Sequence, residues 1–267
     1  MYEIFALTDV GRMREHNEDC FMVNRFVSAS GEYFEVSEGN FIIAVADGMG
    51  GENAGEVASK LTLTTLNSTI IPIANEDLAS KIKDIHRAIL DYGINNSEAK
   101  GLGTTLTGMM CVDDRIITFN VGDSRVYRYR DGILKQLTTD HSLVHALLSA
   151  GKISREEAFD HPRKNELIQS LGGITYADRL QVDVESIRGV FEEDDILLLC
   201  SDGLNDMVRD EDMEQILASG SDIKSLAHSL VAKANDYGGH DNITVVMAIR
   251  KQEELACTDS CSLTDAS

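Results

Sequence analysis

The sequence predicts an α+β fold, a four-layer αββα sandwich in which two antiparallel β-sheets pack together and helices cover their outer faces. Very short links, such as Asp131-Gly132, join strands in the middle of the chain, and links of this length allow only antiparallel neighbours. The strands expected at 41–46 (FIIAVA) and 196–200 (ILLLC) are apolar on both faces, so each needs cover on both sides. Helical segments fall between groups of strands, which argues against a doubly wound parallel sheet.

The strands of the middle and C-terminal regions follow from alternating apolar segments and turn residues. The segment TTLTGMMCV turns at Asp113-Asp114 into RIITFNVGD, and SRVYRYR turns at Asp131-Gly132 into ILKQLT. In the same way, QVDVESIRGV is expected to pair with ILLLCSD through the acidic turn at 192–195. NITVVMAIR is the last strand expected.

Three amphipathic helices are predicted from apolar residues that recur on one helical face. Ser221 is expected to cap the third of them at its N-terminus, and Gly238-Gly239 to end it. Ser154 and Glu157 have the spacing of a capping box, which predicts a short helix directly after Ser154. The apolar faces of the three helices consist of Val57, Leu61 and Leu66; Leu78, Ile82, Ile85 and Ile89; and Ile223, Leu226, Leu230 and Ala234.

The composition predicts one compact domain over residues 1–250. Hydrophobic residues make up 43% of the 267 residues, which is enough for a sizeable core, and no repeat or Pro-rich linker divides the chain. From about residue 251 to 267 the apolar pattern is lost, so this segment is expected to be a disordered tail. A monomer is the expected oligomeric state.

The charge and the cysteines exclude several classes of function. A formal net charge of −21 argues against nucleic acid as a partner, because phosphate backbones need Lys and Arg. No stretch reaches the roughly 20 apolar residues of a membrane span, and no signal peptide is recognisable. The chain has 5 cysteines, an odd number, and they are expected to be reduced thiols in a cytoplasmic protein.

An aspartate stands at one end of each of four apolar strands: Asp47, Asp123 and Asp202 at C-terminal ends, and Asp241 at an N-terminal end. In an antiparallel sheet these ends lie on the same rim. A single aspartate of this kind is usually a turn or cap residue. Several carboxylates on one rim repel one another unless a cation neutralises them, and oxygen ligands select hard ions such as Mg²⁺ or Mn²⁺. The backbone carbonyl of Gly48 is a further candidate ligand, because glycine leaves it accessible.

The N-terminal segment GRMREHNEDC supplies the other residues that such chemistry needs. Arg14 has a planar guanidinium that suits two oxygens of a phosphate. Of the adjacent acids Glu18 and Asp19, one is expected to bind an ion and the other to hold a water. By itself this stretch is typical of a charged surface segment. Together with the strand-end aspartates, it fits phosphoryl transfer to water.

The ordered set of motifs resembles the type 2C family of metal-dependent protein serine/threonine phosphatases (the PPM family) in its compact bacterial form. Each motif is weak alone, but together they follow the family's order over nearly the whole chain. They read TDVGRMREHNED, AVADGMGGENAGEVAS, GLGTTLTG, NVGDSRVY, LTTDHS, CSDGL and GGHDNITVV.

This resemblance implies two Mn²⁺ or Mg²⁺ ions at one end of the β-sandwich. It implies that Asp47 bridges both ions and that Gly48 offers its carbonyl to one of them, beside Glu18. Asp202 and Asp241 are the implied ligands of the other ion.

The resemblance also implies roles for residues around the two ions. Asp19 is expected to orient a water, and Arg14 to bind the substrate phosphate. Asp123, with Asp202, matches a weaker site for a third ion in bacterial relatives. Asp206 matches an acidic position of the family.

The activity implied is hydrolysis of phosphoserine and phosphothreonine in proteins, the substrates of a serine/threonine kinase, by direct attack of a metal-bridging hydroxide. Two alternatives remain open: a catalytically inactive phosphatase-like binding module, and an acidic buffer of divalent cations. An inactive relative is expected to lack one or more site residues, and this chain keeps the implied set. A cation buffer would leave Arg14 without a purpose.

The chain departs from the family in two places. Some relatives have a histidine after the Asp-Gly pair as a candidate general acid, but Met49 stands there, which leaves His16, His240 or a metal-bound water to donate the proton. The segment 141–172 resembles the family's flap beside the active site. Relatives often have a basic residue before its final Leu-Gly, where this chain has Gln169-Ser170, so the substrate preference stays open.

Overall fold

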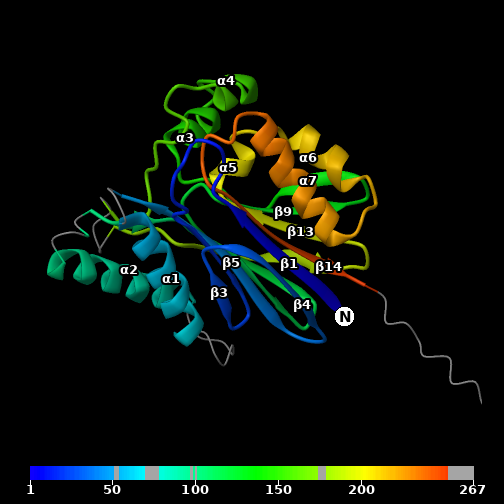
Figure 1. Ribbon diagram of the computed structural model, residues 1–267, viewed down its shortest axis with the longest axis horizontal. Helices are drawn as coiled ribbons and strands as arrows, with labels where there is room; N and C mark the ends of the chain where they lie inside the picture. Colours follow the sequence, from blue (N-terminus) through cyan, green and yellow to red (C-terminus); the bar gives the residue numbers. More distant parts are fainter. Residues whose placement is uncertain (51–53, 70–77, 97–98, 100, 174–178, 252–267) are drawn as a thin grey trace, which may run out of the picture.

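Two antiparallel sheets pack face to face between two layers of helices (Figure 1), so the predicted αββα sandwich is confirmed. The computed structural model describes residues 1–50, 54–69, 78–96, 99, 101–173 and 179–251. In these residues, no helix is long and apolar enough to cross a membrane. Residues 252–267 of the predicted tail lie outside the described residues, and the extent of the catalytic domain stays a prediction.

The first sheet has the strand order β10-β9-β13-β14-β1-β4 among the described residues. Its central strands are buried because apolar residues occupy both faces, as the pairing of Leu198 with Met247 illustrates. The strands are β1 (Tyr2–Asp9), β4 (Gly31–Ser37), β9 (Arg125–Arg130), β10 (Ile133–Gln136), β13 (Ile196–Cys200) and β14 (Ile243–Arg250).

The second sheet follows the order β11-β6-β5-β7-β8-β12, and β2 with β3 branches from β5. The turns predicted at Asp113-Asp114 and Asp131-Gly132 join β7 to β8 and, in the first sheet, β9 to β10, each as an antiparallel pair. The strands are β2 (Asp19–Val23), β3 (Phe26–Ser28), β5 (Phe41–Met49), β6 (Gly103–Thr104), β7 (Leu106–Val112), β8 (Arg115–Val121), β11 (Leu171–Gly172) and β12 (Asp183–Val190).

Helices cover both outer faces. Figure 1 shows α1 (Ala54–Thr69) and α2 (Leu78–Asn95) on one side, and α6 (Asp210–Leu217) and α7 (Ile223–Asp236) on the other. The single turn α5 (Asp202–Asn205) follows β13 directly. The short helices α3 (Leu143–Ser149) and α4 (Arg155–Phe159) stand together at one end of the sandwich.

The core consists of three apolar layers, as expected when both faces of each sheet are covered. The middle layer lies between the sheets and includes Phe41, Val45, Leu197 and Val246. The outer layers lie under α1 with α2 and under α6 with α7. The strands predicted to be apolar on both faces, at 41–46 and 196–200, are buried along their whole length.

One predicted pairing is wrong: β12 and β13 belong to different sheets. β12 pairs with β8, and β13 lies between β9 and β14. The link between them crosses from one sheet to the other because Phe191 is fully buried between the sheets. Arg130 fixes this crossing by pairing with both Glu192 and Asp195.

The helix ends agree with the sequence in part. The capping box of Ser154 and Glu157 is present, with bonds of 3.2 and 2.8 Å. The N-cap of α7 is Asp222 rather than the predicted Ser221, because the Asp222 carboxylate accepts bonds from two backbone N–H groups of the first turn. The helix ends before Gly238-Gly239, as predicted, since both glycines have a positive φ.

Candidate active site

Asp47 lies within β5 and not at its end. The strand continues to Met49, and Gly48 pairs with Thr104 of β6. The Asp47 carbonyl accepts bonds from the Thr105 N–H (2.9 Å) and the Thr104 hydroxyl (2.8 Å), while its own N–H donates to the Thr105 hydroxyl (3.0 Å). The backbone of Asp47 is therefore fixed on both sides, and its carboxylate projects from a rigid strand.

Glycines bring three segments unusually close together beside Asp47. The Gly48 N–H donates to the Glu18 carbonyl at 3.1 Å, and a Cβ on Gly48 would lie 2.2 Å from the Gly55 carbonyl oxygen. A Cβ on Gly55 would meet the Glu18 carboxylate at 2.6 to 2.9 Å. The end of β5, the loop before β2 and the first turn of α1 thus enclose Glu18, and burial raises the pKa of its carboxyl.

Asp19 is the first residue of β2 and stands opposite Asp47 in the β2–β5 pair. Its side chain is buried, and one carboxylate oxygen accepts bonds from the hydroxyls of Ser201 (2.7 Å) and Thr244 (2.6 Å). Burial raises the pKa of Asp19 to about 7, although both hydroxyls act in the opposite direction. These bonds orient the carboxylate between the two sheets.

Arg14 and Asp241 form an ion pair at the mouth of the site. The Arg14 guanidinium donates to Asp241 Oδ2 at 2.7 Å, and the two side chains are 49% and 30% exposed. The backbone N–H of Asn242 donates to the other oxygen of Asp241 at 2.8 Å. Arg14, the predicted phosphate-binding residue, is therefore paired with Asp241, a predicted metal ligand, in this structure.

Asn242 is a site residue that the sequence analysis missed. Its amide oxygen accepts a bond from the Glu18 N–H at 2.8 Å, and its amide nitrogen donates to the carbonyls of Val10 and His16, both at 2.9 Å. One side chain thus fixes the loop that carries Arg14 and Glu18. Its position in the GGHDNITVV motif is the signal that could have identified it.

Asp202 opens α5, and Asp123 lies just beyond β8. The atom Oδ1 of Asp202 is buried, and no hydrogen-bond partner reaches it. Burial, followed by repulsion from the neighbouring aspartates, raises the pKa of Asp47 and Asp202 well above their ordinary values and that of Asp123 to about 7. These aspartates are therefore near enough to repel one another, and their role as metal ligands stays a prediction.

The donor set fits hard divalent cations because it offers only carboxylate and carbonyl oxygens. In the described part of the chain, however, no group of three or more His, Cys, Asp or Glu side chains is close enough together to hold an ion as it stands. The hydroxyls of Ser201 and Thr244 orient the Asp19 carboxylate instead. The Arg14 guanidinium orients the Asp241 carboxylate. Rearrangement of these side chains would therefore have to accompany ion binding.

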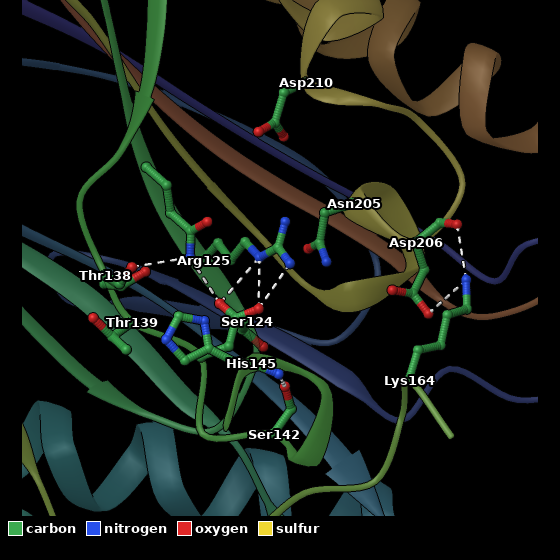
Figure 2. Close-up of polar contacts among 12 residues, drawn as sticks. Ser124, Arg125, Thr138, Thr139, Ser142, His145, Lys164, Asn205, Asp206 and Asp210 are labelled. Atoms are coloured by element: carbon green, nitrogen blue, oxygen red, sulfur yellow. Dashed lines mark hydrogen bonds and ion pairs between the residues drawn. The ribbon is translucent and has the colours of Figure 1, made fainter. Parts of the chain in front are cut away.

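A second group of charges borders the site (Figure 2). The Lys164 ammonium lies 3.1 Å from the Asp206 carboxylate and donates to the Asp206 carbonyl at 3.0 Å. The Arg125 guanidinium makes three bonds to the buried carboxylate of Asp140, at 2.7 to 3.1 Å. Arg125 also lowers the pKa of Asp123, although burial keeps that pKa above its ordinary value.

Residues 29–234 match the model of the protein phosphatase 2C family, and the chain belongs to that family. The resemblance inferred from the motifs is thereby confirmed.

The relatives are bacterial serine/threonine phosphatases. The chain is 41% identical to the serine/threonine phosphatase stp of Listeria monocytogenes, over 91% of this chain and 94% of that protein. It is 36% identical to the protein phosphatase PhpP of Streptococcus pneumoniae, over 94% and 99%. The serine/threonine phosphatase of S. agalactiae has the same fold, with a TM-score of 0.79 and 35% identity over 94% of this chain and 100% of that one. The catalytic domain of PstP, in complex with two manganese ions, gives a TM-score of 0.74 and 32% identity over 94% and 100%.

Proposed function

We propose that this protein is a metal-dependent phosphatase that hydrolyses phosphoserine and phosphothreonine in proteins. The observation that carries the proposal is a set of mutually repelling carboxylates from separate segments, one of which, Asp202, has a buried oxygen without a partner. Carboxylates crowded in this way stay ionised at neutral pH only if a cation binds among them, because otherwise they take up protons. The relatives named as serine/threonine phosphatases support the same activity.

Two ions of Mn²⁺ or Mg²⁺ are the proposed cofactors. Asp47 would contact both ions, with Glu18 and the Gly48 carbonyl at one and Asp202 and Asp241 at the other. Asp123 would contribute to a weaker third ion. When bound, such ions activate a water and neutralise the charge of the phosphate. The manganese-containing PstP structure supports this assignment.

The protein's own residues position the substrate and the attacking water. Arg14, released from Asp241 when an ion takes that carboxylate, would turn its guanidinium to two phosphate oxygens. Asp19, held by two hydroxyls, would accept a hydrogen bond from the water and fix its direction. The thioether of Met49 cannot donate a proton, so the leaving oxygen has to take its proton from His16, His240 or water.

The substrates proposed are phosphoproteins made by a serine/threonine kinase, and the protein is proposed to act as a monomer in the cytoplasm. Cys20, Cys111 and Cys200 are buried free thiols, which supports a reducing compartment. Residues 1–250 would form the catalytic domain, with 141–172 as its flap.

The test is phosphate release from an aryl phosphate and from a phosphothreonine peptide after removal of metals with EDTA. Activity is expected only after Mn²⁺ or Mg²⁺ is added, and Asp202→Ala is expected to abolish it. Asp84→Ala, at a carboxylate on the exposed face of α2, is the matched control and should retain activity. Full turnover in EDTA would refute the metal mechanism. Mn²⁺ binding without hydrolysis would support the inactive binding module instead.

A further inference from the structure

A line of hydrogen-bonded side chains leads away from Asp19 into the first sheet. The Thr244 hydroxyl of β14 lies 2.6 Å from Asp19 Oδ2, and it also lies 2.6 Å from the Thr8 hydroxyl of β1. Thr8 and Thr244 stand directly opposite each other in the β1–β14 pair, so the register of the two strands fixes their contact. The Asn17 amide nitrogen lies 2.8 Å from Thr8 Oγ1 and ends the line. Both threonines are buried, so bulk water does not compete for their hydroxyls.

The direction of every bond in this line follows from its two ends. The Asn17 amide oxygen accepts a bond from the Asp19 N–H at 3.1 Å, and its nitrogen donates to the Ala29 carbonyl at 3.2 Å, which fixes the orientation of the amide. The second N–H of Asn17 therefore donates to Thr8. At the other end, an ionised carboxylate only accepts, so Thr244 donates to Asp19. One arrangement is left for the Thr8 hydroxyl, which donates to Thr244.

Ser201 brings a second donor to the same oxygen of Asp19. Its hydroxyl accepts a bond from the Thr244 backbone N–H at 3.0 Å and donates to Asp19 Oδ2 at 2.7 Å. The Asn242 carbonyl, the other acceptor near this hydroxyl, is farther away at 3.4 Å. Within the described part of the chain, the hydrogen bonds to the Asp19 side chain all end on Oδ2. Oδ1 is therefore the oxygen left to accept a bond from a water.

We propose that Thr8 and Asn17 are positioning residues of the phosphatase reaction, which keep the Thr244 hydroxyl directed at Asp19 Oδ2 and so reserve Oδ1 for the attacking water. In a dry interior, each donor of such a line polarises the next, which strengthens the last bond. Without a donor behind it, the Thr244 hydroxyl is free to turn away, and the Asp19 carboxylate gains a second orientation. This inference rests on the proposed function and names residues that act through Asp19 without touching the substrate.

The experiment replaces Thr8 by valine, which has nearly the same shape but no hydroxyl, and by serine, which keeps the hydroxyl. Thr8→Val is expected to lower kcat about tenfold on a phosphothreonine peptide, with an unchanged KM and an unchanged Mn²⁺ affinity by calorimetry. Thr8→Ser is expected to restore most of the kcat. Thr118→Val removes a buried hydroxyl from β8 of the other sheet, and this control should keep the full kcat.

A double-mutant cycle tests whether Thr8 acts through Asp19. Asp19→Asn removes the charge at which the line of donors is directed, so adding Thr8→Val to it should lower the remaining kcat no further. A merely structural role of Thr8 would lower kcat equally in both backgrounds. Thr244→Val, measured in the same way, carries the test if Thr8→Val does not fold.

The inference is overturned if Thr8→Val keeps the full kcat, or if its effect is undiminished in the Asp19→Asn background. If the unmodified protein still hydrolyses the peptide only with Mn²⁺ in that case, the proposed function survives alone. Absence of Mn²⁺-dependent hydrolysis by the unmodified protein would overturn both.

Discussion

The position of the Glu18 carboxylate depends on two glycines that approach it from different elements. A Cβ on Gly48 would meet backbone atoms, the Gly55 carbonyl oxygen at 2.2 Å and the Glu18 carbonyl oxygen at 2.5 Å. The three atoms nearest to a Cβ on Gly55 all belong to the Glu18 carboxylate, which is the movable end of a side chain. A side chain at Gly48 would therefore disturb the fold, whereas a side chain at Gly55 would displace the Glu18 carboxylate at the site.

Gly55→Ala is expected to reduce phosphatase activity by about 100-fold while the protein stays folded, because a displacement of about 1 Å of a positioned group costs this much. Its stability should not fall, since alanine favours the helix by up to about 1 kcal/mol over glycine. Activity with saturating Mn²⁺ and urea unfolding measure the two effects. Gly39→Ala, where no atom lies within 4 Å of the new Cβ, is the control. Unreduced activity in Gly55→Ala would mean that Glu18 has no role at the site.

At the scale of elements, α2 is joined to β11 by a buried histidine. His86 is fully buried, and its Nδ1 accepts a bond from the Gly172 N–H of β11 at 2.9 Å. In the neutral ring the proton is therefore on Nε2, which is buried without a partner. Burial lowers the pKa of His86, because a charged imidazolium would lose its solvation there.

The metal-free protein is therefore expected to lose stability from His86 as the pH falls. The folded-state pKa lies below that of the unfolded chain, so the unfolded chain binds more protons in acid. His86 does not lower the free energy of unfolding above about pH 6.5, the usual pKa of histidine, and it lowers that free energy increasingly below this pH. Urea unfolding at pH 7.5 and 5.5 should show a smaller loss for His86→Gln, which keeps an acceptor but does not titrate. The exposed His228→Gln should keep the full loss, and equal losses in both variants would exclude His86 as the cause.

At the scale of the whole molecule, the fold concentrates negative charge at one end of the sandwich, where Arg14 and Lys164 pair with Asp241 and Asp206 rather than with the inner aspartates. Asp47, Asp123 and Asp202 repel one another within a largely apolar structure. The stability of this protein is therefore expected to be coupled to its cofactors, because an ion that binds only the folded state stabilises it.

Asp202→Asn is expected to raise the melting temperature of the metal-free protein at pH 8, because the neutral amide removes one of the repelling charges. At pH 5 the difference should shrink, since the raised pKa of Asp202 leaves more of its carboxyl protonated there. Added Mn²⁺ should raise the melting temperature of the unmodified protein by an amount corresponding to about 2.7 kcal/mol at 100 times its Kd, and that of the variant by less. A variant that is less stable than the unmodified protein without metal would contradict the repulsion.

The sequence by itself determined the class of fold and the family. It did so because the two-residue turns, the apolar strands and the ordered motifs are local signals that the residues themselves carry. The roles of Arg14, Glu18, Asp19 and the metal ligands remain predictions.

Tertiary structure alone decided which sheet each strand joins and which distant side chains meet. The burial of Phe191 sends β12 and β13 into different sheets, although their short link resembles a hairpin turn. Asn242 holds a loop more than 220 residues away in the chain, and Lys164 reaches Asp206 across 42 residues. Contacts of this kind depend on how the sheets and helix layers pack together, and no local pattern of residues predicts that packing.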